Sequence, residues 1–353
     1  MLYYKNLPSN AVINLIAPTA SGKTDLAYRL YETGRFELIS VDSALIYRGM
    51  DIGTAKPSAN ELLQYPHHLV DIVSPTDTFN VSDFVGSVRS LIDEIHAKGK
   101  LPLLVGGTMM YYMALLDGLS TVPQTDEAVR TSVMNELKAD GVAQLYKELQ
   151  VIDPVICQRL KVSDTQRITR AIEVYRQTGT PLSVWQATPK TALANNPNQA
   201  WHALLVMPDR AWLHERIALR LEMMWQAGFV DEVIALLQKY PNLSLAMPSM
   251  RCVGYRQVLE YLLATEHELV RQHAVWEEYL QNIHNNDEVE QQNTSALTNI
   301  SHEMACQDMK NKALYATRQL AKRQYTWLRQ LLRLNDSVQM IAGQSHKQLS
   351  EKA

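Results

Sequence analysis

Hydrophobic residues in the first third of the chain alternate between short continuous runs and segments with helical spacing. The runs at 11–17, 37–41 and 101–105 are typical of buried strands, and helical patterns over 22–31 and 84–97 separate them. Short apolar strands that alternate with helices indicate parallel βαβ units, in which helices cover both faces of the sheet. We therefore predict an α/β fold with a parallel sheet and helices on both faces.

After Pro123 the pattern becomes wholly helical until the apolar run AWHALLVM at 200–207, which again fits a buried strand. The segment TPKTALANNPNQA just before that run is rich in Pro and Asn and has the composition of a linker. This order indicates an all-helical domain inserted into an α/β core. The predicted boundaries are 1–121 and 199–335 for the core, 122–198 for the helical insertion and 336–353 for a C-terminal tail.

Charge is segregated in the last third of the chain. Residues 282–303 are polar, rich in Asn and Gln and poor in large apolar side chains, so we predict a flexible insertion within the core there. Seven acids and no Lys or Arg lie from 276 to 308, whereas seven bases and no acid lie from 310 to 333. The totals, 34 Lys+Arg against 37 Asp+Glu with a net charge of −3, argue weakly against a nucleic-acid partner. The segregation nevertheless leaves room for local basic patches.

The chain of 353 residues, with 46% hydrophobic and 20% charged residues, has the composition of a packed protein of about two domains. Its three cysteines lie far apart, with no C-x-x-C pair and no His at ligand spacing, so we expect neither a disulfide framework nor a zinc site. No apolar run reaches the ~18 residues that a membrane span requires. We therefore expect a cytoplasmic protein with no membrane partner.

The strongest local motif is APTASGKT at 17–24, between a predicted strand and a predicted helix. It matches the phosphate loop G-x-x-x-x-G-K-[ST], except that Ala17 replaces the first Gly. Backbone N–H groups at the helix start would point at phosphate oxygens, Lys23 would neutralise them, and the Thr24 hydroxyl could hold Mg²⁺. Because Ala tolerates positive φ less well than Gly, we expect the start of the loop to be shifted or strained. The alternative is a fortuitous Gly-Lys-Thr helix start.

A second acid that would hold Mg²⁺ for nucleotide hydrolysis is missing from the expected place. The strand at 101–105 ends in Gly106-Gly107-Thr108 without a carboxylate, and HLVD at 68–71 is only a short substitute. This indicates a P-loop-type core whose loop binds a diphosphate for a purpose other than γ-phosphate hydrolysis. The predicted diphosphate-binding residues are Ala17, Pro18, Thr19, Ala20, Ser21, Gly22, Lys23 and Thr24.

Two polar residues follow the second and third predicted strands. Asp42 lies at the carboxyl end of its strand, which is the edge where ligands bind in open α/β sheets. It could face the same crevice as Lys23 and accept a proton, or it could merely cap a following helix. Thr108 would lie at the same edge, or it could be an ordinary residue of a Gly-Gly turn.

Three predicted helices, at 164–179, 211–228 and 315–332, place cations on one face at i, i+3 or i+4 spacing. The third helix would use Leu320, Trp327 and Leu331 on its core face. One such stripe is usually a solvated face, but three in a chain with a phosphate loop favour contacts to nucleic-acid phosphates. The cations are Arg167 and Arg170, Arg216 and Arg220, and Arg318, Lys322 and Arg329.

Seven motifs occur in order between residues 11 and 330. They are APTASGKT, VDSALIYRGMDIGTAKP (41–57), PHHLVDI (66–72), VGGTMMYY (105–112), DTQRITRAIEV (164–174), MRCVGYRQ (250–257) and ATRQLAKRQYTWLR (316–329). Together they resemble the tRNA dimethylallyltransferase family of bacteria, also called tRNA isopentenyltransferases. Ala17 and the insertion at 282–303 depart from the family pattern.

The resemblance implies transfer of a dimethylallyl group from dimethylallyl diphosphate to N6 of the adenine at position 37, in tRNAs that read codons beginning with U. Asp42 would orient the amine and take its proton, with Thr108 supporting the same site. Lys23, Arg220 and a Mg²⁺ ion held by Thr24 would stabilise the leaving diphosphate. Because a stacked base cannot reach the donor, the adenine would be extruded into the core.

The resemblance also implies that the insertion at 122–198 grips the anticodon stem-loop while the core contacts the loop and its backbone. We expect a monomer. The implied tRNA-binding residues are Asp42, Ser43, Ala44, Leu45, Thr108, Arg130, Gln166, Arg167, Ile168, Thr169, Arg170, Met247, Pro248, Ser249, Met250, Arg251, Cys252, Arg318, Lys322 and Arg323.

Other functions remain open at this point. A phosphate-loop kinase of a small molecule or nucleotide would consume ATP, but it leaves the cationic helices unexplained. A non-catalytic RNA-binding module would not depend on Lys23. Within the transferase class, the acceptor could be a free adenine nucleotide instead of tRNA, although the basic helices and the helical insertion favour tRNA.

Overall fold

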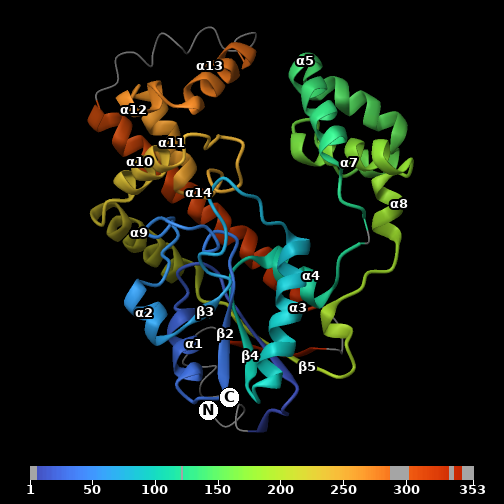
Figure 1. Cartoon of the computed structure of the whole chain (residues 1–353), viewed down its shortest axis with the longest axis vertical. Coiled ribbons are helices and arrows are strands. Elements are labelled where there is room, and N and C mark those ends of the chain that lie inside the picture. The colour runs from blue at the N-terminus through green and yellow to red at the C-terminus, as the bar shows by residue number, and fades with distance from the viewer. Residues whose placement is uncertain (1–5, 121, 287–301, 334–337, 344–353) are drawn as a thin grey trace. The chain divides into compact units, whose positions relative to one another are not determined.

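The computed structural model of the chain describes residues 6–120, 122–286, 302–333 and 338–343. They fold into two compact units (Figure 1). Unit 1 comprises Met1–Leu116 and Asn196–Ala353, and unit 2 comprises Asp117–Asn195. Unit 2 overlaps the helical insertion that the sequence predicts at 122–198.

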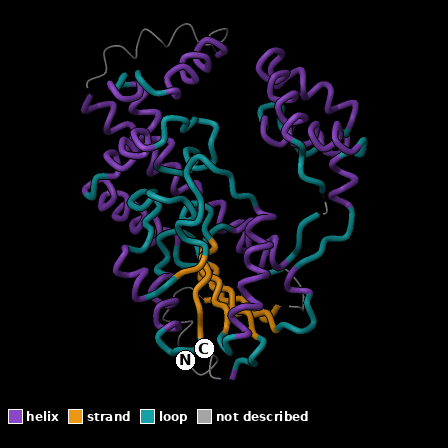
Figure 2. The backbone as a smooth tube through the Cα atoms, viewed as in Figure 1, coloured by secondary structure: helices purple, strands orange, loops and turns teal. Residues whose placement is uncertain are grey.

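Unit 1 is built on a six-stranded parallel sheet (Figure 2). The strands are β1 (Ala11–Ile16), β2 (Phe36–Val41), β3 (His67–His68), β4 (Leu101–Gly106), β5 (Ala200–Val206) and β6 (Val338–Gly343), in the spatial order β3-β2-β4-β1-β5-β6. The predicted parallel α/β fold is confirmed. The expected tail at 336–353 is wrong for residues 338–343, because they pair in parallel with β5.

Helices cover both faces of the sheet, as the continuous apolar strands require. Helix α1 (Lys23–Tyr31) lies on one face, where Leu26 and Leu30 join a core with strand residues such as Leu15. Helices α3 (Val81–Ala97) and α4 (Met109–Leu116) lie on the other (Figure 1).

The carboxyl ends of β1, β2 and β4 meet at one edge, where the loops gather (Figure 2). Gly106 is required there, because a Cβ at this position would lie 2.0 Å from the Val41 carbonyl oxygen. The absence of a side chain brings two strand ends together, and the Thr108 N–H donates to the same Val41 oxygen at 3.2 Å. The loop that carries Asp42 therefore lies beside the loop that carries Thr108.

The rest of unit 1 is helical. Phe229 and Tyr255 are fully buried in its core and pack edge to face, with ring centroids 4.9 Å apart. Residues 282–286 continue α13 and residues 302–303 begin α14, so the predicted flexible insertion is wrong at both ends. Its residues 287–301 lie outside the described part of the chain. These helices are α2 (Ala59–Gln64), α9 (Arg210–Gln226), α10 (Phe229–Lys239), α11 (Tyr255–Ala264), α12 (Glu268–Arg271), α13 (Ala274–Asn286) and α14 (His302–Leu331).

Unit 2 is all-helical among its described residues. It contains α5 (Glu127–Ile152), α6 (Pro154–Cys157), α7 (Thr165–Thr178), α8 (Leu182–Ala187) and the 3-10 turn η2 (Leu193–Asn195).

A break at Gly141, whose φ is 75°, divides α5 into two arms. Arg176 on α7 holds both arms, since its guanidinium contacts Glu136 at 2.5 Å and Glu148 at 3.0 Å. Hydrogen bonding by Arg176 lowers the pKa of Glu136, so this ion pair persists to a lower pH than it would with an ordinary glutamate.

Candidate active site

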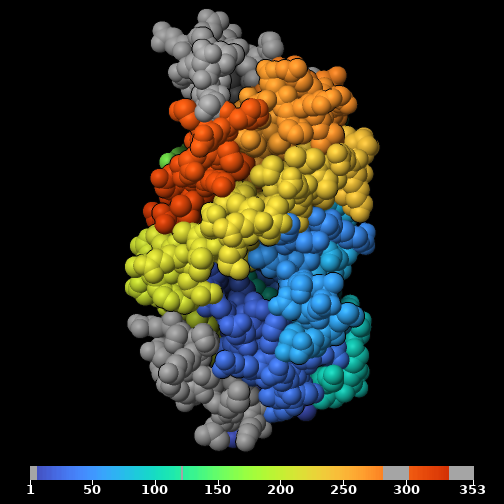
Figure 3. Space-filling model, turned by 90° about the vertical axis from the view of Figure 1, so that its left-hand side faces the viewer, coloured from blue at the N-terminus to red at the C-terminus, as the bar shows by residue number. Residues whose placement is uncertain are grey.

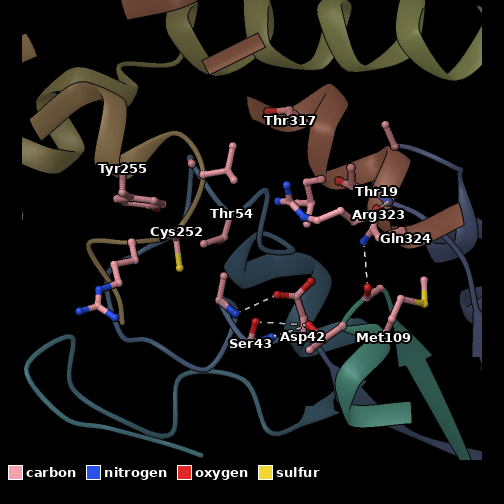
Figure 4. Close-up of a pocket in the computed structure, with 18 of the residues that line it drawn as sticks. Thr19, Asp42, Ser43, Thr54, Met109, Cys252, Tyr255, Thr317, Arg323 and Gln324 are labelled. Atoms are coloured by element: carbon pink, nitrogen blue, oxygen red, sulfur yellow. Dashed lines mark hydrogen bonds between the residues drawn. The ribbon is translucent and has the colours of Figure 1, made fainter. Parts of the chain in front are cut away.

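A pocket of about 520 Å³ opens at the carboxyl edge of the sheet within unit 1. Its walls come from the phosphate loop, the ends of β2 and β4, one face of α9, the loop at 248–253 and α14 (Figure 4). In Figure 3 the yellow-green surface of α9 adjoins the blue surface of the first third of the chain, and the surface is hollowed where they meet. Asp42 is the one carboxylate among the described residues that line the pocket, whereas four lining residues are cations. They are Lys23, Arg220, Arg251 and Arg323.

The phosphate loop differs from the expected form at its start. Ala17 is fully buried and does not have a positive φ, so the expected strain at this residue is wrong. The left-handed positions are Ala20, with a φ of 60°, and Gly22, with a φ of 80°. For an alanine this conformation costs about 1–2 kcal/mol. The Arg216 Nε donates to the Ala20 carbonyl oxygen at 3.2 Å, which helps to hold it.

Lys23 begins α1 and lines the pocket with Thr19 and Ala20. Burial lowers the pKa of Lys23 from 10.5 to about 8; the nearby Asp42 charge opposes this shift and Arg220 adds to it. A buried lysine binds an anion favourably, because the anion replaces interactions lost with water and stabilises the protonated form of the lysine. The pocket therefore suits a phosphorylated ligand at this end.

The pKa of Lys23 predicts a pH dependence of anion binding. We expect the wild-type affinity for inorganic pyrophosphate to fall as the pH rises through about 8, because Lys23 loses its positive charge. In Lys23→Met this step should disappear, leaving only the ionisation of pyrophosphate itself. Calorimetric titrations between about pH 7 and 9 would measure both proteins. The same pH dependence in the two proteins would contradict the assignment.

The contribution of Lys23 to folding stability changes with pH in the direction opposite to that of a lysine in an ion pair. Since the folded pKa lies near 8 and the ordinary value is 10.5, the unfolded chain binds more protons between these pH values. The contribution of Lys23 to the free energy of unfolding therefore rises with pH across this window.

Asp42 and Thr108 lie at adjoining strand ends, as predicted. The Ala44 N–H donates to Asp42 Oδ1 at 2.9 Å, and residues 43–46 form turns, so Asp42 does not cap a helix. Thr108 Oγ1 accepts from the Ser43 N–H at 3.0 Å and donates to Ser43 Oγ at 3.4 Å. The threonine thereby fixes the backbone next to Asp42, and Figure 4 shows Asp42 and Ser43 together at the pocket wall.

Arg220 reaches the pocket from α9, whose apolar residues Ile217 and Met224 line it on either side. Its Nη2 donates to the Thr54 carbonyl oxygen at 3.4 Å. Burial lowers the pKa of Arg220, while the Asp42 charge raises it. A guanidinium nevertheless stays protonated in proteins, so it supplies a permanent positive charge to the pocket that Asp42 also lines.

Glu232 on α10 supports this wall of the pocket, although no sequence motif predicted it. Its carboxylate accepts the N–H groups of Asp51 at 2.9 Å, Ile52 at 2.6 Å and Gly53 at 3.1 Å. The Tyr255 hydroxyl donates to the same carboxylate at 2.5 Å. The turn that precedes the Thr54 carbonyl is therefore held by one side chain from a distant helix.

The pocket collects many of the unit 1 residues that the sequence singles out, although Thr24, exposed on α1, lies outside its lining. Those that line the pocket are Thr19, Ala20, Lys23, Asp42, Ser43, Ala44, Thr108, Arg220, Pro248, Arg251, Cys252 and Arg323. Those outside its lining are Ala17, Pro18, Ser21, Gly22, Thr24, Leu45, Met247, Ser249, Met250, Arg318 and Lys322.

Four of the residues predicted to contact RNA have buried side chains in the structure. Ser249 has no exposed surface and donates to the Pro75 carbonyl oxygen at 2.6 Å, and Met250 is in the core. In unit 2, Ile168 is in the core and the Thr169 hydroxyl donates to its own helix at 3.0 Å. Helical periodicity makes a run such as 166–170 place some of its residues inward.

The other residues of unit 2 that are predicted to contact tRNA differ in their exposure to solvent. Arg130, Gln166 and Arg167 are exposed. Arg170 is partly buried and hydrogen-bonds to Thr125 and to the Pro123 carbonyl.

The predicted core face of α14 is confirmed at Leu331, which is fully buried, and wrong at Leu320 and Trp327, which line the pocket. Leu328 belongs to the buried side as well, and the buried Gln324 also lines the pocket. Apolar residues that line a pocket carry the same periodic signal as those that line a core, so the pattern alone could not separate them.

Among the described residues, no helix is long and apolar enough to cross a membrane, and no three His, Cys, Asp or Glu side chains form a group that could hold a metal ion.

The fold and the site define a P-loop α/β protein with a carboxylate beside its anion-binding loop. Comparison with known proteins narrows this class. The chain matches the IPP transferase family over residues 45–331 and belongs to that family. The predicted resemblance is thereby confirmed.

The similarity extends along nearly the whole chain. The chain is 58% identical over 347 residues to a tRNA dimethylallyltransferase of Psychrobacter sp. (strain PRwf-1), covering 97% of this chain and 92% of that protein. It is 47% identical over 328 residues to a tRNA dimethylallyltransferase of Acinetobacter baumannii (strain ACICU), covering 92% of each. The crystal structure of full-length tRNA isopentenylpyrophosphate transferase from Bacillus halodurans matches with a TM-score of 0.56 at 28% identity, covering 97% of this chain and 94% of that one.

Proposed function

We propose that the protein is a tRNA dimethylallyltransferase. It transfers the dimethylallyl group of dimethylallyl diphosphate to N6 of the adenine at position 37, in tRNAs that read codons beginning with U. The observation that carries the proposal is the pocket in which Asp42 lies with Lys23 and Arg220 at the phosphate loop. Identity of 58% to a protein of that activity supports it.

The cationic end of the pocket suits a diphosphate that leaves. As the allylic C–O bond breaks, negative charge grows on the diphosphate oxygens, and Lys23 and Arg220 stabilise it from fixed positions. A leaving diphosphate needs no hydrolytic water, which explains why β4 ends in glycines and not in an acid. The lone pair of the adenine amine forms the new N–C bond, and Asp42 accepts the proton that N6 loses.

Mg²⁺ fits this site only as a partner of the diphosphate. Thr24 offers one exposed hydroxyl beside Lys23, and the described residues hold no carboxylate cluster that could bind the ion alone. Mg²⁺ usually takes one or two protein oxygens, with phosphates and water as its other ligands. When bound, the ion would add positive charge to the diphosphate.

The tRNA anticodon stem-loop would be held by exposed cations of both units. In unit 1, Arg251 and Arg323 line the pocket where an extruded adenine would enter. In unit 2, Arg130 and Arg167 are exposed and suited to backbone phosphates. As part of this proposal, the protein acts as a monomer in the cytoplasm.

The proposal is tested by incubating the purified protein with Mg²⁺, dimethylallyl diphosphate and unmodified tRNA whose anticodon ends in adenine. The expected product is an anticodon loop heavier by one dimethylallyl group, detected by mass spectrometry. Modification of AMP in preference to tRNA, or consumption of ATP without prenyl transfer, would contradict it.

Raising the salt concentration should weaken tRNA binding steeply, since the contacts are local cationic patches on a chain of net charge −3.

A further inference from the structure

Gln324 is a buried polar side chain on α14 that the proposed chemistry does not use. Gln324 is 6% exposed. In the sequence it follows the exposed cations Lys322 and Arg323 and precedes the buried Tyr325. A buried amide is stable only when its donor and its acceptor are both satisfied. The two groups that bond to the Gln324 amide therefore show which parts of the structure this side chain connects.

Both partners of Gln324 are backbone groups of the active site. The Thr19 N–H in the phosphate loop donates to Gln324 Oε1 at 3.1 Å, across 305 positions of the chain. Gln324 Nε2 donates to the Gly107 carbonyl oxygen at 2.8 Å, directly before Thr108 (Figure 4). One side chain thus links the anion-binding loop after β1 to the loop after β4.

Gly107 is matched to this contact. A Cβ at Gly107 would lie 2.8 Å from Gln324 Nε2 and 3.1 Å from the Ala17 carbonyl oxygen, so a larger residue would push the amide away. The φ of Gly107 is not positive, and the backbone therefore does not itself require glycine. The space that glycine leaves is filled by the Gln324 amide.

We propose that Gln324 is a positioning residue that fixes the phosphate loop relative to the Gly107–Thr108 loop. The inference rests on the proposed function, because the two loops would carry the donor diphosphate and the acceptor amine. A carboxamide is neutral and carries its acceptor and its donor on separate atoms, so one side chain accepts from the Thr19 N–H and donates to the Gly107 carbonyl. Gln324 also shapes the loop itself, since the Thr19 N–H is engaged by the amide and is not aimed at phosphate.

The direct test compares Gln324→Met with Gln330→Met, a control on the exposed side of the same helix. We expect Gln324→Met to raise the KM for dimethylallyl diphosphate and lower kcat, together reducing kcat/KM about 10- to 100-fold, with the KM for tRNA unchanged. Affinity for inorganic pyrophosphate should fall in parallel. Unchanged donor kinetics, or a uniform loss of active protein that leaves both KM values intact, would overturn the proposal.

A second test does not depend on that variant folding well. Gly107→Ala displaces the amide, and Gln324→Ala removes it, so the double variant should be no less active than the worse single variant. Losses that multiply in the double variant would show that the two residues act separately, against the proposal. The prenylation assay of the wild type tests the proposed function separately. If the wild type does not prenylate tRNA, the proposed function fails, and the affinity for inorganic pyrophosphate still tests the role of Gln324.

Discussion

Replacing Asp42 by asparagine is expected to lower kcat for dimethylallyl transfer about 10²- to 10⁴-fold, which is the usual contribution of a positioned general base. Asparagine keeps an oxygen that can accept from the Ala44 N–H, so the turn after β2 should persist. It cannot accept the proton that N6 loses. The affinity for tRNA should therefore change little while turnover is lost.

Single-turnover measurements with saturating tRNA and donor isolate the chemical step in this variant. Asp93→Asn is the matched control, because Asp93 is an exposed carboxylate on α3 outside the pocket. It should keep wild-type turnover. If Asp42→Asn also turned over at the wild-type rate, Asp42 would not be the base.

Replacing Arg220 by methionine is expected to lower kcat/KM for dimethylallyl diphosphate about 10²- to 10³-fold, the usual loss when one fixed donor to a developing negative charge is removed. Methionine fills a similar volume and resembles its neighbour Met224, so the pocket wall should remain packed. Arg220→Lys should recover part of the loss, because it restores the charge without the planar guanidinium.

The control for this pair is Arg210→Met, which removes an exposed arginine at the start of the same helix. Steady-state kinetics with the donor varied at saturating tRNA would measure all three variants, and their thermal unfolding would show that α9 remains folded. A variant Arg220→Met with the kcat/KM of the wild type would remove Arg220 from the diphosphate site. Equal losses in Arg210→Met would indicate a general effect of charge.

The parts of the site predicted from the sequence are those in which chemistry and position are local. The phosphate loop, Asp42 and Thr108 each directly follow a recognisable strand, and carboxyl ends of parallel strands share an edge. Their convergence in one pocket needed only the α/β fold. The expected strain at Ala17 was wrong because the left-handed position is three residues later, at Ala20.

Other features could not be predicted because their partners are far apart in the sequence. Glu232 meets the Ile52 N–H across 180 positions, and Gln324 meets the Thr19 N–H across 305. A single glutamate or glutamine on a helix has no local pattern that distinguishes such a bond from a solvated surface. The use of Trp327 as a pocket residue depended likewise on what α14 packs against, whereas the inward position of Ile168 follows from the helical period of its segment.

The sequence by itself determined the parallel α/β core, the helical insertion and the residues at the ends of β1, β2 and β4, because hydrophobic period and loop motifs are encoded within a few neighbouring residues. The tertiary structure alone decided that residues 338–343 extend the sheet beside β5, that Arg220 lines the same pocket as Asp42, and that α14 joins two active-site loops through Gln324. Each of these features depends on which strand edge, carbonyl or N–H group a segment distant in the sequence contacts in the folded chain. Buried backbone groups must be hydrogen-bonded, but the sequence near them does not show which segment supplies the partner.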